Sequence, residues 1–198
     1  IMRYKELTFE GRNAVLEAFR SGKTIDKLYI LDGCQDGPVK SIVREAKKTS
    51  TIISYVEKER LDRLANTGHH QGVVAIGAAY EYADVEDILE AARSKGEDPF
   101  IFILDEIEDP HNLGAIIRTA NLAGAHGVII PKRRAVGLTA TVAKTSAGAI
   151  NYTPVAKVTN IAATIESLKK EGLWFVCAVM GGETMYNLNL KGPIGLVI

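Results

Sequence analysis

The sequence predicts an α/β protein whose C-terminal half is built around a parallel β-sheet. Residues Phe100–Leu104 form a short apolar run of branched and aromatic side chains, which is typical of a buried parallel strand. Apolar residues then recur at helical spacing at Leu113, Ile116, Ile117 and Ala120. A second apolar run follows at Gly127–Pro131, so residues 99–131 predict a strand, a helix and a second strand of one βαβ unit.

Residues 1–80 predict a smaller α/β domain in which helices and strands alternate. The expected elements are, in chain order, Gly11–Arg20, Leu28–Leu31, Pro38–Lys48, Thr51–Val56, Lys58–Leu64 and Gly72–Ile76. An acidic segment over residues 81–98 follows, and Asp84 can cap a helix over Val85–Ala92 within it. We therefore expect a domain boundary near residue 80, an acidic linker with its helix, and a second domain over residues 99–198.

Further elements are expected in the second domain. Asn112 can cap the helix after the first strand through its side-chain oxygen. Thr159 or Asn160 can cap another helix, which runs to residue 170. The run Leu173–Met180 predicts a core strand with Cys177 buried inside it.

Composition and charge exclude several classes of protein. No apolar run reaches the roughly eighteen residues of a membrane span, and the N-terminus lacks a signal-peptide pattern, so we expect a cytoplasmic protein. Cys34 and Cys177 lie far apart, without a Cys/His cluster, which argues against a disulfide framework or a metal site. Lys and Arg outnumber Asp and Glu by 13 to 10 in residues 1–78 and by 9 to 7 in residues 99–198, but are outnumbered by 7 to 2 between them. The two basic flanks favour an RNA partner modestly.

Polar residues gather where the first strand of the βαβ unit ends. The carboxyl end of a strand is where open α/β sheets bind ligands, and Asp105, Asp109 and Asn112 follow it here. Arg118 comes one helical turn after Gly114, whose missing side chain leaves room for the guanidinium or for a ligand. From spacing alone, Arg118 can bind a phosphate or form a salt bridge that ties the loop to the helix.

The same stretch resembles a known signature. The run from Asp105 to Ala120, D-x-x-x-D-P-x-N-x-G-x-x-x-R-T-A, resembles the first signature of the SpoU/TrmH family of RNA ribose 2′-O-methyltransferases. Lys144–Ala149 resembles the family's K-x-S-A-G-A segment. Gly11–Val15 and His70–Val74 resemble the branch that modifies a guanosine of 23S rRNA, so the resemblance covers nearly the whole chain.

The resemblance implies a SPOUT-type methyltransferase domain over residues 99–198, preceded by a ribosomal-protein-like RNA-binding domain. It also implies S-adenosylmethionine as the cofactor, a homodimer, and no metal. The family's second and third signatures, G-x-E-G-x-G and S-L-N-x-S, carry most cofactor contacts and close a C-terminal trefoil knot, and neither occurs in this sequence. Because the sequence stops at Ile198 inside a predicted apolar strand, we expect a truncated protein, with a short RNA-binding paralogue as the alternative.

The resemblance assigns roles to individual residues. The expected catalytic residues are Asn112 and Arg118, and the expected cofactor contacts are Met180, Gly181 and Gly182. The expected RNA contacts are Arg12, Asn13, His70, Gln71, Lys144 and Ser146. Two of these groups also have a physical basis: Arg12 and Asn13 lie at a helix start suited to phosphate, while His70 and Gln71 are expected to form an exposed polar cluster that can read unpaired bases.

These expectations combine into an RNA 2′-O-methyltransferase with a guanosine of 23S rRNA as its target. Because arginine stays protonated, Arg118 is expected to stabilise the developing alkoxide or to hold the adjoining phosphate. Two alternatives stay open, namely a non-catalytic RNA-binding or ribosome-assembly module and a tRNA methyltransferase of the same family. A Rossmann-type nucleotide-binding enzyme is disfavoured because no G-x-G-x-x-G or P-loop sequence follows a predicted strand.

Overall fold

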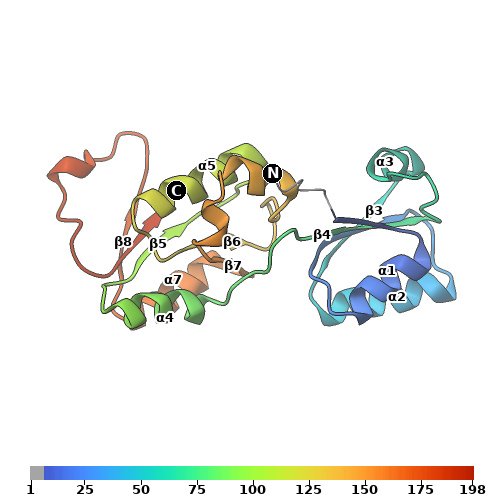
Figure 1. The fold of residues 1–198 in the computed structure, drawn as a ribbon, viewed down its shortest axis with the longest axis horizontal. Coiled ribbons are helices and arrows are strands. Elements are labelled where there is room, and N and C mark those ends of the chain that lie inside the picture. Colours follow the sequence, from blue (N-terminus) through green and yellow to red (C-terminus); the bar gives the residue numbers. More distant parts are fainter. Residues whose placement is uncertain (1–6) are drawn as a thin grey trace. The chain divides into compact units, whose positions relative to one another are not determined.

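The computed structural model describes residues 7–198, which form two compact units (Figure 1). Unit 1 ends at Glu81 and also includes Gly137–Ala140, whereas unit 2 comprises Tyr82–Val136 and Thr141–Ile198. Each unit combines helices with one β-sheet, which confirms the predicted α/β fold class.

Unit 1 contains a four-stranded mixed sheet in the order β1-β4-β2-β3. Its strands are β1 (Leu7–Glu10), β2 (Ile25–Leu31), β3 (Ile52–Val56) and β4 (Val73–Gly77). The β1–β4 and β4–β2 pairs are antiparallel, and β2 and β3 are parallel because a helix crosses from one to the other.

Alternating side chains of β2 divide unit 1 into two helical layers. Leu28 and Ile30 pack with helices α1 (Arg12–Arg20) and α2 (Gly37–Lys48) on one face of the sheet. Tyr29 points to the other face, where it packs with Leu61 of α3 (Lys58–Leu64). Figure 1 shows α1 and α2 together beneath this sheet and α3 above it.

Unit 2 is built on a five-stranded sheet in which every neighbouring pair is parallel, as predicted for this half of the chain. The strand order is β7-β6-β5-β9-β8. The strands are β5 (Phe100–Ile103), β6 (Gly127–Pro131), β7 (Val155–Val158), β8 (Trp174–Cys177) and β9 (Ile194–Val197). The central strand, β5, therefore lies between β6 and β9.

Helices cover both faces of the unit 2 sheet (Figure 1). Ile101 and Ile103 pack on one face with α4 (Val85–Lys95) and α7 (Ile161–Lys170). The opposite face is covered by α5 (Pro110–Leu122), whose buried residues include Leu113 and Ile117. The helix of the acidic segment, α4, is thus part of the unit 2 core, and it starts with a capping box between Asp84 and Asp87.

Three short helices complete the described fold. These are α6 (Ala140–Thr145) and the 3₁₀ helices η1 (Ala149–Asn151) and η2 (Met185–Asn187). None of the helices in the described part of the chain combines the length and apolar character needed to cross a bilayer.

The predicted core strand over Leu173–Met180 is wrong in two respects. The strand β8 ends at Cys177, and the Cys177 side chain is exposed rather than buried. Met180, beyond the strand, is fully exposed. The reason is that β8 pairs only with β9 and forms the edge of the sheet, a position that an apolar run in the sequence does not reveal.

The predicted cap of α5 is also wrong. Asp109, not Asn112, precedes the helix, and its carboxylate accepts a hydrogen bond from the backbone N–H of Asn112 at 2.7 Å. Pro110 then occupies the first helical position, where its missing N–H costs nothing. The predicted cap of α7 is confirmed, since Asn160 accepts from the backbone N–H of Ala163 at 3.0 Å.

Candidate functional site

The carboxyl ends of the unit 2 strands meet at one edge of the sheet, because all five strands run in the same direction. From β5 the chain moves outward through β6 and β7, and then returns to add β8 and β9 on the other side. The winding reverses between β5 and β9, which is where open α/β sheets bind ligands. At this point the backbone N–H of Asp105 donates to the carbonyl of Ile198 at 3.0 Å.

The loop between β5 and α5 is held by the loop that follows β6. Glu106 forms an ion pair with Arg134, and the N–H of Val136 donates to the carbonyl of Ile107 at 2.7 Å. Both members of the ion pair have left-handed backbones, with φ of 56° and 57°. One interpretation of the sequence was that Arg118 forms a salt bridge with this loop. In the structure, Arg134 forms that salt bridge instead.

Asn112 and Arg118 are both exposed on α5. Neither side chain has a hydrogen-bonding or ionic partner within residues 7–198. They are six positions apart in the chain, so in a regular helix they lie about 9 Å apart along the axis and about 120° apart around it. They therefore do not share one face, and a ligand that contacts both must extend along the helix.

Gly114 faces another helix rather than open space. A Cβ built on Gly114 would lie 1.9 Å from Oγ1 of Thr145 and 2.9 Å from the carbonyl oxygen of Val142. The interpretation that this glycine leaves room for the guanidinium or a ligand is thus wrong, because α6 occupies that space. The Thr145 hydroxyl donates to the carbonyl of Thr141 at 2.9 Å. The carbonyl oxygen of Pro110 lies 3.2 Å from the same hydroxyl.

The helix α6 and the segment that follows η1 lie on the same side of α5 as Arg118. Gly114, Arg118 and Asn121 recur at helical spacing, and Asn121 donates to the Thr153 hydroxyl at 3.0 Å. Gly114 contacts Thr145 on one side of Arg118 along α5, and Asn121 contacts Thr153 on the other side.

Two residues predicted to contact RNA, Lys144 at the end of α6 and Ser146 just after it, have different environments. Lys144 is exposed, in agreement with that role. Ser146 is fully buried, and its hydroxyl donates to the carbonyl of Ala143 at 2.9 Å. The prediction that the Ser146 side chain contacts RNA therefore does not agree with this structure, because the hydroxyl is enclosed by its own turn.

Met180, Gly181 and Gly182 lie in the long loop that leaves β8 at the same edge of the sheet. Only β9 separates β8 from β5, so the starts of the two loops are about 10 Å apart at normal strand spacing. Gly181 has φ of 77°, and a Cβ there would meet nothing within 4 Å. The loop thus presents a glycine turn and exposed apolar side chains beside the loop that precedes α5.

In unit 1 the fold brings together Arg12 and Gln71, which are 59 positions apart in the chain. The Arg12 backbone N–H donates to Oε1 of Gln71 at 3.1 Å, and its Nε donates to the Gln71 carbonyl at 3.2 Å. The guanidinium also pairs with Asp36 at 2.5 Å. A cavity of about 490 Å³ is lined by Arg12, Cys34 and Gln71, while Asn13 is exposed at the start of α1.

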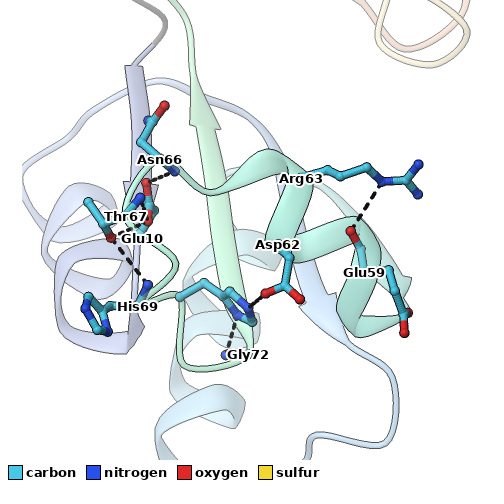
Figure 2. Close-up of polar contacts among 9 residues, drawn as sticks. Glu10, Glu59, Asp62, Arg63, Asn66, Thr67, His69 and Gly72 are labelled. Carbon is cyan, nitrogen blue, oxygen red and sulfur yellow. Dashed lines mark hydrogen bonds and ion pairs between the residues drawn. The ribbon is translucent and has the colours of Figure 1, made fainter.

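His70 is buried, so its predicted place in an exposed cluster is wrong. Its Nδ1 accepts from the N–H of Gly72 at 3.0 Å, and its Nε2 lies 2.9 Å from a carboxylate oxygen of Asp62. Because Nδ1 is the acceptor, Nε2 carries the proton and donates to Asp62. Figure 2 marks these contacts at Asp62 and Gly72 with dashed lines. They fix the ring inside the loop, whereas the neighbouring His69 and Gln71 are exposed.

Glu10 holds the other end of the same loop (Figure 2). Its carboxylate accepts from the backbone N–H groups of Asn66 and Thr67 and, at 2.7 Å, from the Thr67 hydroxyl. Although desolvation acts to raise it, these hydrogen bonds from Thr67 and Asn66 hold the pKa of Glu10 below its ordinary value of 4.5. The loop before β4 is therefore ordered by two acidic side chains, Glu10 and Asp62.

Comparison with known proteins assigns a family to each part of the chain. The model of the SpoU rRNA Methylase family matches residues 99–198, and the model described as RNA 2′-O ribose methyltransferase substrate binding matches residues 9–83. The chain belongs to the SpoU family of RNA methyltransferases. This confirms the resemblance to the SpoU/TrmH family found in the sequence.

Relatives of this SpoU protein cover almost all of its length. It is 50% identical over 189 residues to the putative TrmH family tRNA/rRNA methyltransferase YacO of Bacillus subtilis, covering 95% of this chain and 76% of YacO. It is 45% identical over 195 residues to a putative TrmH family tRNA/rRNA methyltransferase of Staphylococcus haemolyticus, covering 98% and 78%. The fold matches the crystal structure of the SpoU methyltransferase AviRb from Streptomyces viridochromogenes with AdoMet, with a TM-score of 0.54, 20% identity, and coverage of 98% and 72%.

Several residues that shape the SpoU site were not singled out from the sequence. Thr145 contacts Gly114 from 31 positions away, and Asp62 contacts His70 from eight positions away. Glu10 holds the loop before His70 through Thr67, which is 57 positions away. Helical or strand periodicity carries no signal over such distances. The one available local signal was Asp109 directly before Pro110, a pattern that is typical of a capped helix start.

Proposed function

We propose that the protein is an S-adenosylmethionine-dependent ribose 2′-O-methyltransferase that acts on a guanosine of 23S rRNA, as a homodimer in the cytoplasm. Family membership supports RNA methylation as the reaction class. The N-terminal matches at Gly11–Val15 and His70–Val74 support the rRNA guanosine as target. The match of residues 9–83 to a substrate-binding model supports a division of labour, with RNA held by unit 1 and methylated at unit 2.

The observation that carries this proposal is the state of Arg118. It is an exposed cation without an ionic partner among the described residues, on the helix that follows the central strand. A structural arginine would be expected to pair with a nearby carboxylate, which Arg118 does not do within residues 7–198. The ion pair to the loop that precedes α5 joins Glu106 to Arg134 instead. Arg118 is therefore available for a phosphate or for a sugar oxygen.

The chemistry requires alignment of a ribose hydroxyl and removal of its proton. A guanidinium stays protonated, so we assign Arg118 to stabilising the negative charge that develops on the 2′-oxygen, or to holding the adjoining phosphate. Asn112 lies about 9 Å away along α5 and in a different direction, so we assign it to orienting a neighbouring part of the nucleotide. Asp109 is occupied as the helix cap and keeps the loop in shape.

The described residues fit one side of a cofactor site. Val179 and Met180 are 63% and 101% exposed, and apolar side chains of this kind can cover an adenine ring. Gly181 leaves open space where a larger residue would project. When bound, S-adenosylmethionine supplies the methyl group from its sulfonium, and Met180, Gly181 and Gly182 would hold its adenosine, as expected from the resemblance.

Substitution of Arg118 tests the proposal. Loss of one group that stabilises a developing oxyanion lowers kcat by about 10²–10³-fold, and we expect Arg118→Ala to have an effect of this size on methylation of a 23S rRNA transcript. Arg60→Ala, which removes an exposed cation from α3, is the matched control and should retain activity. Equal activity of Arg118→Ala and the wild-type protein would refute the assignment.

Two further measurements distinguish the alternatives. Calorimetry with S-adenosylmethionine should give saturable binding, whereas a non-catalytic RNA-binding module would bind RNA without binding the cofactor. Parallel methylation assays on 23S rRNA and tRNA transcripts should show preference for rRNA. Preference for tRNA would overturn the proposed target while leaving the reaction class intact.

A further inference from the structure

A basic groove lies between α2 and the edge strand β3 of unit 1. We define it by Lys40, Arg44 and Lys47 on α2, by Tyr55 on β3, and by Val39 and Val43 at its apolar base. Its volume is about 410 Å³. None of the residues predicted to bind RNA line this groove, so no role was assigned to it from the sequence.

The three cations form one continuous row. Positions 40, 44 and 47 lie within about 60° of one another around a regular helix and span about 10 Å along its axis. All three side chains are exposed, and within residues 7–198 none of them forms an ion pair. The neighbouring carboxylate of Glu45 is engaged with Lys48 at 2.8 Å, so it does not neutralise the row.

Tyr55 supplies an aromatic surface next to this row. Its side chain is 55% exposed, although it belongs to a strand. Side chains two residues apart in a strand share a face, and Ile53 packs with the core between the sheet and helices α1 and α2. Tyr55 therefore points to the same face as α2. An exposed tyrosine beside a row of cations is the combination that proteins use to stack a base and bind its backbone phosphates.

We propose that this basic groove binds a single-stranded segment of the RNA substrate, with an unpaired base stacked on Tyr55 and phosphates bound by Lys40, Arg44 and Lys47. The inference rests on the proposed function, because it takes RNA as the substrate. An acidic peptide would satisfy the cations but would leave the tyrosine ring without a stacking partner. The aromatic face therefore favours RNA.

The salt dependence of RNA binding tests the cation row. Fluorescein-labelled oligouridylate is titrated with the protein at several salt concentrations. Each phosphate contact contributes about 0.7 to the slope of log Kobs against log salt for a single strand, so Lys40→Ala/Arg44→Ala/Lys47→Ala should reduce the slope by about 2. Lys58→Ala/Arg60→Ala/Arg63→Ala removes the same charge from α3, on the opposite face of the sheet, and should leave the slope unchanged.

Tyr55 variants test the stacking contact. Tyr55→Ala should weaken binding of the oligouridylate by about tenfold, whereas Tyr55→Phe, which keeps the ring, should bind like the wild-type protein. Because Tyr55 is largely exposed, neither change should alter the fold, which circular dichroism can check.

The outcomes separate this inference from the proposed function. If the wild-type protein binds and methylates RNA while both sets of groove variants bind equally well, the groove assignment is wrong and the proposed function stands. Binding that an oligoglutamate peptide displaces as efficiently as oligouridylate, with no effect of Tyr55→Ala, would identify a general polyanion surface and would also overturn it. A wild-type protein without affinity for RNA would refute both.

Discussion

Gly114→Ala is the substitution for which the structure makes the sharpest prediction. The new Cβ would lie 1.9 Å from Oγ1 and 2.8 Å from Cβ of Thr145, and 2.9 Å from the carbonyl oxygen of Val142. Rotation of the Thr145 side chain can remove only the first of these contacts, and it would break the hydrogen bond to Thr141. The other two involve atoms fixed by the backbone, so α5 and α6 must move apart.

The expected cost follows from two opposing terms. Overpacking of a well-packed interface costs about 1–3 kcal/mol, and the backbone contact places this site at the upper end of that range. Replacement of glycine by alanine inside a helix returns about 1 kcal/mol through helix propensity. We therefore expect Gly114→Ala to lower the free energy of unfolding of unit 2 by about 1–2 kcal/mol.

Urea denaturation followed by Trp174 fluorescence provides the assay, because Trp174 is the single tryptophan and lies in β8 of unit 2. Thr145→Ala removes the atom at 1.9 Å, so Gly114→Ala/Thr145→Ala should lose less stability than the sum of the two single changes. Gly37→Ala is the control for the glycine effect itself. A Cβ there meets nothing within 4 Å, and circular dichroism should show stability equal to or above the wild-type value. A Gly114→Ala protein as stable as the wild type would refute the packing argument.

Three further predictions concern the cap of α5, the Glu10 carboxylate and a second buried glycine. Asp109→Ala should lower the stability of unit 2 by about 1 kcal/mol in the Trp174 assay, whereas Asn112→Ala should not, since only Asp109 caps α5. The Glu10 carboxylate has a lowered pKa, so its contribution to loop order is complete above pH 4.5 and is lost as the pH falls through its lower folded value. The backbone amide NMR signals of Thr67 should therefore titrate below pH 4.5, and should not do so in Glu10→Gln. Gly127→Ala would place a Cβ 2.6 Å from buried Ile88 and should cost about 1–3 kcal/mol, and an unchanged urea midpoint would contradict this.

Short sequence patterns located most helices and strands, because the formation of each depends on residues that are close together in the chain. A parallel strand buried on both faces must be apolar throughout, so Phe100–Ile103 and Gly127–Pro131 stand out as uninterrupted runs. Short or partly exposed strands lack this signal. The strands β1 and β7 were missed because each is partly exposed, so neither stands out as an uninterrupted buried run.

The candidate site shows the same division. The sequence placed Asn112 and Arg118 on one helix after a strand, which the structure has, because the motif spans a few helical turns. It misjudged what surrounds them. The space beside Gly114 belongs to Thr145, 31 positions later, and the salt bridge to the acidic loop belongs to Arg134.

The sequence by itself determined the α/β class, the order of most helices and strands, and the SpoU signature around Asp105–Ala120. Only the tertiary structure decided which polar side chains are exposed and what each one contacts. Thus His70 and Ser146 are enclosed by their own turns, Cys177 lies on an edge strand, and the cations of α2 stand beside Tyr55. The physical reason is that helix and strand formation depends on residues a few positions apart, whereas exposure and pairing depend on sheet order and helix packing, which join residues distant in the chain.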